Sequence, residues 1–300
     1  MNLYETNKNH SIVLFFITLF LIGLNIINFN LEIPFLIIIC FFLISTIGIT
    51  HGALDNLKGY KILKIYKIKH KYIFYLTYIF ISLLVIFLWF LFPLLSLSLF
   101  LLIASYHFGK EDSNFGKKNK TRLIGLFFLL KGSIVVLAPL TFHTEETLKI
   151  FEILGIQLEI MNVNILLLFL GFSLLSNIFI NNSAKICLAD WFSILFLNIT
   201  FSPLIAFTIY FCFLHSVRHS ISLIHELNKN NFKKGFKDFV KKALPLTTIT
   251  GFLYLIAAFL LSNSYGLDAA ILKVVFIGLA SLTFPHILLE YLLEKNEKRS

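Results

Sequence analysis

Five of the nine histidines in this chain lie at or near the ends of apolar segments, and their side chains are suited to metal chemistry. They are His51, His107, His215, His219 and His286. Neutral imidazole is a common metal ligand, and several imidazoles together suit Fe, Zn or Cu. The three cysteines are far apart and form neither a CxxC pair nor a CxxCH haem-attachment motif, which argues against iron–sulfur and cysteine-bound zinc sites. The histidines therefore predict a metal site built mainly from imidazole.

Four of these five histidines are followed four residues later by a second polar group. The segments are HGALD at 51–55, HFGKE at 107–111, HSVRH at 215–219 and HILLE at 286–290. Residues i and i+4 share one face of a helix, so His215 and His219 could offer two imidazoles to one ion. A carboxylate at i+4 could accept a hydrogen bond from a ligand's second ring nitrogen and orient the ring. The spacing therefore predicts three supporting carboxylates, Asp55, Glu111 and Glu290.

Single residues of this kind have an alternative explanation, because a lone histidine or acid near a helix end is usually solvated. Ionisable groups inside membrane spans are costly, however, and several together usually mark a functional site. Arg218, inside the HSVRH segment, leaves two interpretations open. It could pair with Glu111 or Glu290, or extend its charged end to the membrane surface.

The elements that must position these residues are membrane-spanning helices. Of 300 residues, 58% are hydrophobic and 14% are charged, whereas soluble domains carry about 25% charged residues. A spanning helix needs about 20 apolar residues, so the chain predicts an all-α, polytopic transmembrane bundle of about ten helices, with residues 1–300 as a single domain. Apolar runs fall near 12–29, 33–50, 72–92, 94–108, 123–141, 163–180, 187–200, 202–225, 246–262 and 270–293.

The charges of the connecting segments predict how the chain is threaded through the membrane. Basic residues collect on the cytoplasmic side of short loops, and 57–72, 110–122, 228–242 and the tail after Leu293 are basic. The 142–162 connection carries four glutamates and one lysine. Ten helices with both termini in the cytoplasm place every basic segment inside and this connection outside. The same distribution argues against nucleic-acid binding, despite a net charge of +10.

This threading brings the five histidines to one depth, at the cytoplasmic ends of the second, fourth, eighth and tenth spans. Convergence at one depth from several helices is what a metal site requires. The other four histidines, His10, His70, His143 and His225, are scattered.

At these same residues the chain resembles the bacterial Brp/Blh family of β-carotene 15,15′-dioxygenases. The similar segments are HGALDN at 51–56, ASYHFGKEDS at 104–113, FCFLHSVRHS at 211–220 and FPHILLEYL at 284–292. Tyr106 stands where the family often has tryptophan, and Val217 occupies a variable position, so neither departure removes a candidate ligand.

The resemblance implies an enzyme of the cell (cytoplasmic) membrane that uses O2 and Fe(2+) to cleave the central double bond of β-carotene into two molecules of retinal. It implies His51, His107, His215 and His219 as the iron ligands. The family motif also contains the histidine at position 286, but His286 is not one of the four implied ligands. We expect it to support catalysis from beside the site. The substrate would enter sideways from the lipid bilayer, and a retinal-binding microbial rhodopsin is the implied acceptor of the product.

Two other classes of protein remain as alternatives. Five histidines with three carboxylates could hold two metals, as in di-iron membrane hydroxylases or desaturases, but those usually repeat HxxxH and HxxHH boxes, and only one HxxxH occurs here. A transporter with a histidine- and acid-based ion or proton path would spread polar groups through the membrane depth. Here they gather at one end.

Overall fold

A computed structural model describes residues 3–27, 35–113, 123–179 and 184–297 of the chain, and these residues form helices and connecting turns without a strand. The predicted all-α fold is confirmed. In chain order the helices are α1 (Leu3–Ile26), α2 (Leu36–Thr46), η1 (Gly48–Gly52), α3 (Asp55–Ile65), α4 (Tyr72–Leu91), α5 (Pro93–Glu111), α6 (Ile124–Gly132), α7 (Ile134–Phe142), α8 (Thr144–Ile153), α9 (Val163–Phe179), α10 (Ala184–Thr200), α11 (Pro203–Ile209), η2 (Tyr210–Ser216), α12 (Val217–Leu227), α13 (Phe232–Tyr265) and α14 (Leu267–Glu297).

Among the described residues, eight continuous helical segments are long and apolar enough to cross a membrane. Three of them join consecutive elements: α2–η1–α3, α6–α7 and α11–η2–α12. The apolar helix α9 has 17 residues and α10 has 17, so both are shorter. Each apolar run in the sequence thus has a helical counterpart, and the bundle is polytopic as expected. Many large apolar side chains lie exposed on its outer surface, as in a protein whose solvent is lipid.

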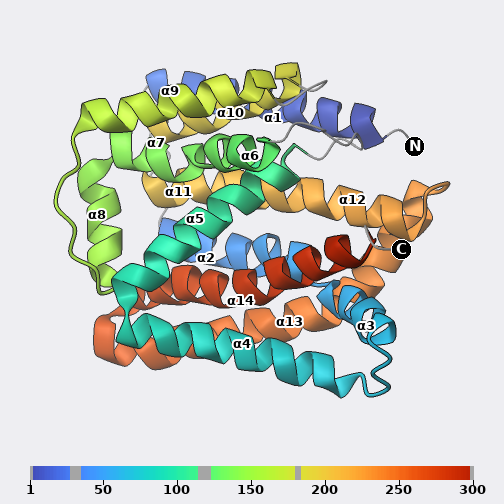
Figure 1. Cartoon of the computed structure of the whole chain (residues 1–300). Helices are drawn as coiled ribbons and strands as arrows, with labels where there is room; N and C mark the ends of the chain where they lie inside the picture. The colour runs from blue at the N-terminus through green and yellow to red at the C-terminus, as the bar shows by residue number, and fades with distance from the viewer. Residues whose placement is uncertain (1–2, 28–34, 114–122, 180–183, 298–300) are drawn as a thin grey trace.

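The two ends of the bundle differ as the loop charges predict (Figure 1). α1 begins and α14 ends at the same end of the bundle as α3 and the start of α13, which carry the basic segments 57–72 and 228–242. The acidic connection contains α8 and lies at the opposite end. Most of the basic segment 110–122 falls outside the described residues.

Two departures from regular α-helix occur at histidine-bearing segments. His51 lies on η1, a 3₁₀ helix between α2 and α3. His215 lies on η2, a π-helix that continues into α12. Such irregular turns change the direction in which later side chains point and are frequent at functional sites. The Gly48 carbonyl joins them, because it accepts hydrogen bonds from His51 Nδ1 and Ser216 Oγ, both at 2.8 Å.

The helix that carries His107 is fixed by an unusually close crossing. A Cβ on Gly109 of α5 would lie 1.8 Å from the Phe128 carbonyl oxygen, and one on Gly132 of α6 would lie 1.9 Å from the Ser105 carbonyl oxygen. Only glycine allows the two backbones this approach. This close crossing holds α5 and α6 tightly together next to His107.

Candidate metal centre

The five histidines that the sequence singles out converge at one place in the bundle. The ring centre of His51 lies 5.2 to 6.3 Å from those of His107, His215, His219 and His286. His107 lies 5.3 Å from His215 and 5.2 Å from His286. The rings therefore surround a common point, although they come from η1, α5, η2, α12 and α14.

One nitrogen of most of these rings is left without a protein partner. The Nε2 atoms of His107, His215, His219 and His286 are buried and have no hydrogen-bond partner among the described residues. One ring nitrogen from each of His51, His107 and His215 lies within 4.8 Å of the others. A buried polar atom left unpaired is costly, so an ion bound here would satisfy several such atoms at once.

The opposite ring nitrogen, Nδ1, is held by an oxygen in four of the five histidines. His51 Nδ1 is 2.8 Å from the Gly48 carbonyl oxygen, His215 Nδ1 is 3.1 Å from Asp112, His219 Nδ1 is 3.1 Å from Glu111, and His286 Nδ1 is 2.9 Å from Asp55. An oxygen acceptor at Nδ1 places the ring proton there and leaves Nε2 as a lone-pair donor. Metal-binding histidines in proteins usually have this arrangement.

The three predicted carboxylates all lie beside the cluster, but only Glu290 lies near the histidine that the i+4 spacing suggests, His286. Asp55 contacts His286 rather than His51, and Glu111 contacts His219 rather than His107. Glu290 lies 3.9 Å from His107 Nδ1 and 3.7 Å from His286 Nε2, and its main partner is Lys58 at 2.8 Å. The i+4 rule holds within one regular helix, as for His286 and Glu290 on α14, whereas Asp55 and Glu111 reach across to neighbouring helices.

Asp112 is a member of the site that sequence reasoning missed. It follows α5 and accepts hydrogen bonds from His215 Nδ1 and, at 2.7 Å, from the Tyr210 hydroxyl. Burial alone would raise the pKa of Asp112, but His215, Arg218 and Lys131 together lower it below its usual value. These three partners therefore favour the carboxylate form of Asp112. The sequence could have suggested Asp112 as a site residue, because it directly follows Glu111 in the segment KEDS.

Arg218 follows neither of the two interpretations that the sequence left open. It is buried, and its guanidinium contacts the Asp190 carboxylate at 2.7 and 3.1 Å and the Ser11 hydroxyl at 2.6 Å. The expected pairing with Glu111 or Glu290 and the extension to the membrane surface are both wrong. Burial beside Asp190 decides its position, because a buried charge needs a close counter-charge.

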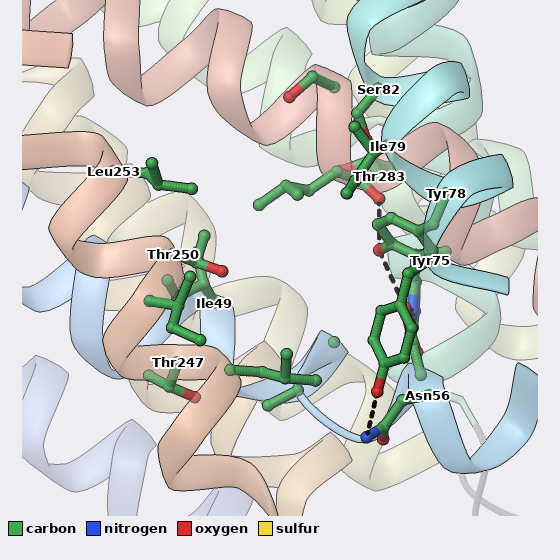
Figure 2. A pocket seen from close by; sticks show the side chains of 18 of the residues that line it. Ile49, Asn56, Tyr75, Tyr78, Ile79, Ser82, Thr247, Thr250, Leu253 and Thr283 are labelled. Carbon is green, nitrogen blue, oxygen red and sulfur yellow. Dashed lines mark hydrogen bonds and ion pairs between the residues drawn. The ribbon is translucent and has the colours of Figure 1, made fainter. Parts of the chain in front are cut away.

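A cavity of about 370 Å³ adjoins the histidine cluster and includes His51, His286 and Asp55 in its wall. Figure 2 shows Tyr75, Tyr78, Ile79 and Ser82 of α4 on one side, and Thr247, Thr250 and Leu253 of α13 on the other. Several apolar residues of this wall are more than half exposed on the outer surface: Ile79, Leu83, Ile249 and Leu253. The cavity therefore reaches from the lipid-facing surface to the histidines.

Fold and site together define a class: a polytopic helical membrane protein with a buried imidazole cluster, suited to a divalent transition metal and open sideways to lipid. Comparison with known proteins then gives the family. A family model described as Beta-carotene 15,15'-dioxygenase matches residues 42–294, and this chain belongs to that family.

A curated relative, Beta-carotene 15,15'-dioxygenase from Uncultured marine bacterium 66A03, is 29% identical over 268 residues. The alignment covers 86% of this chain and 94% of the relative. No solved structure matches the chain.

Proposed function

We propose that this chain is a membrane dioxygenase that cleaves β-carotene with O2 at the central 15,15′ double bond and yields two molecules of retinal. The observation that carries the proposal is the juxtaposition of the imidazole cluster with a lipid-facing, mainly apolar cavity. Membership of the family and the name of the relative support the same reaction.

The cofactor proposed is Fe(2+), held by His51, His107, His215 and His219. The fit rests on the buried Nε2 atoms without protein partners, and on oxygen acceptors that fix Nδ1 in three of these four rings. Imidazole ligands with open positions suit ferrous iron, which when bound would supply the activation of dioxygen. Four carboxylates beside the histidines support the proposed centre: Asp55, Glu111, Glu290 and Asp112.

The residues of the cavity bind and place the polyene. Ile49, Leu279 and Leu282 line it close to the histidines, and the exposed apolar residues of α4 and α13 line its outer part. A hydrocarbon dissolved in the bilayer can enter between these helices without crossing water. The walls hold one double bond beside the imidazole cluster and exclude water, and this positioning is the main contribution of the protein.

Expression in cells that accumulate β-carotene tests the reaction directly. We expect β-carotene to be replaced by retinal in a ratio of about one to two, as symmetric cleavage requires. The His215→Ala variant, checked for equal amounts of folded protein, is the control and should leave the carotene intact. Undiminished carotene from folded wild-type protein, or aldehydes of unequal length, would contradict the proposal.

The orientation in the cytoplasmic membrane is a separate proposal, in which both termini and the histidine cluster face the cytoplasm. It is supported by the basic segments at one end of the bundle and the acidic connection at the other. Single cysteines in 57–72 and 228–242 should react with an impermeant reagent only from the cytoplasmic side. Those in 142–162 should react only from the other side, and reversed labelling would refute this orientation.

A further inference from the structure

His286 has the same surroundings as the four histidines assigned as ligands. Its side chain is 2% exposed, and its ring centre lies 5.2 Å from those of both His51 and His107 and 5.9 Å from that of His219. With a metal–nitrogen bond of about 2.1 Å, two imidazoles on one ion have ring centres no more than roughly 6.5 Å apart. The position of His286 thus fits direct binding.

The protonation of the His286 ring is set by Asp55. Both oxygens of this carboxylate lie 2.9 Å from Nδ1, so Nδ1 carries the proton and donates it. Asp55 also accepts a hydrogen bond from the Tyr78 hydroxyl at 3.0 Å. The ring is therefore fixed through a chain of contacts from the cavity wall, and its Nε2 presents a lone pair to the cluster, without a hydrogen-bond partner among the described residues.

The ring of His286 is held more firmly at Nδ1 than the ring of His107. The Nδ1 atom of His107 lies 3.9 Å from Glu290, too far for a hydrogen bond, whereas His286 has two carboxylate oxygens at 2.9 Å. By the criterion of an oriented ring with a free lone pair, His286 is better prepared to bind a metal than His107.

Glu290 does not account for the buried Nε2 of His286. Their closest atoms are 3.7 Å apart, and the same Glu290 oxygen lies 2.8 Å from Lys58 Nζ. Left unpaired within a membrane-spanning helix, Nε2 would carry the cost of an unsatisfied buried polar atom. A bound ion removes this cost.

We propose that His286 is a fifth imidazole ligand of the metal, held in place by Asp55 and Tyr78. The proposal rests on the metal centre of the proposed function but not on carotenoid cleavage. A fifth imidazole would leave fewer positions on the metal open to dioxygen than four imidazoles would. In this arrangement Tyr78 and Asp55 are positioning residues that connect the substrate cavity to the metal.

Metal binding by the purified full-length protein in detergent tests the proposal without any substrate. Apoprotein is titrated anaerobically with Co(2+), and the visible ligand-field spectrum and dissociation constant are recorded for wild type, His286→Ala, Asp55→Asn and Tyr78→Phe. We expect one ion per wild-type chain. His286→Ala should change the spectrum and weaken binding by more than about 100-fold, because a supporting partner alone typically costs about 10–100-fold.

Asp55→Asn should keep the wild-type spectrum with about 10–100-fold weaker binding, and Tyr78→Phe should have a smaller effect. Added imidazole should restore the wild-type spectrum to His286→Ala, which also shows that this variant is folded. His70→Ala, at an exposed histidine, is the matched control and should bind as wild type does.

Three results would overturn the proposal. One is a His286→Ala protein with the spectrum of the wild type and an affinity within about threefold of it. Another is a folded His286→Ala protein whose changed spectrum does not respond to imidazole. The third is two ions per wild-type chain, which would favour a dinuclear centre. If wild type binds no metal at all, the proposed iron centre itself fails.

Discussion

Two groups of buried polar side chains lie side by side in this bundle, and they differ in how their atoms are satisfied. In the first, the histidine cluster, ring nitrogens point at one another without partners among the described residues. In the second, centred on Arg218, the Asp190 carboxylate neutralises the guanidinium at 2.7 Å, and Lys131 donates to the Asp112 carbonyl and the Ser113 hydroxyl, both at 2.9 Å.

The difference between the two groups indicates which buried polar side chains are suited to bind a ligand. A charge that is paired within the protein stabilises the fold or fixes its geometry, whereas several convergent imidazole lone pairs without donors are suited to bind a cation. Asp112 joins the two groups, since its carboxylate holds His215 and its backbone carbonyl holds Arg218.

The largest expected effect is the loss of the metal from the first group. If the proposed ligand set is right, replacing His51, His107, His215 or His219 by alanine deletes a metal bond. Each purified variant should lose nearly all iron and more than about 100-fold of its activity, beyond the cost of losing a supporting partner. Elemental analysis of iron per chain tests whether each of these histidines is a ligand. Near-stoichiometric iron in any of the four would remove that residue from the ligand set.

In the second group the expected effect is on stability rather than on the metal. Arg218→Ala leaves Asp190 as an uncompensated buried charge, which should lower the free energy of unfolding by about 3–5 kcal/mol. The double variant Arg218→Met with Asp190→Leu should recover much of this loss. Unfolding in detergent measures both, and the folded fraction should retain its iron. If Arg218→Ala is as stable as wild type but free of iron, the distinction between the two groups fails.

Glu111→Gln and Asp112→Asn should give intermediate effects that separate the two groups further. Glu111→Gln weakens the orientation of His219, so iron affinity or activity should fall by about 10–100-fold with little change in stability. Asp112→Asn should reduce both iron affinity and stability, because Asp112 contacts both groups. Equal stability losses in the two variants would show that the groups are not distinct.

The smallest effect is expected in the outer cavity, where unpaired polar atoms would face the proposed apolar substrate. The hydroxyls of Ser82 and Thr247 line the cavity without a partner among the described residues. Ser82→Ala and Thr247→Val should lower KM for β-carotene by no more than roughly threefold and leave kcat unchanged, since only an unpaired hydroxyl is removed. A large fall in kcat would mean that these hydroxyls act at the reacting centre.

The sequence by itself determined the class of fold and the five histidines that gather at the site. Apolar runs of spanning length require helices in lipid, and threading ten of them by loop charge brings His51, His107, His215, His219 and His286 to one end. These conclusions depend only on chain length, hydropathy and order, which local sequence carries.

Only the tertiary structure decided which carboxylate supports which histidine and where Arg218 lies. His51 stands on a 3₁₀ helix and Asp55 begins the next helix, so their i+4 spacing no longer places them on one face. The π-helix that carries His215 likewise departs from regular helix geometry, and its partner Asp112 lies just after the end of α5. The packing of neighbouring helices fixes contacts of this kind, because they join residues more than a hundred positions apart.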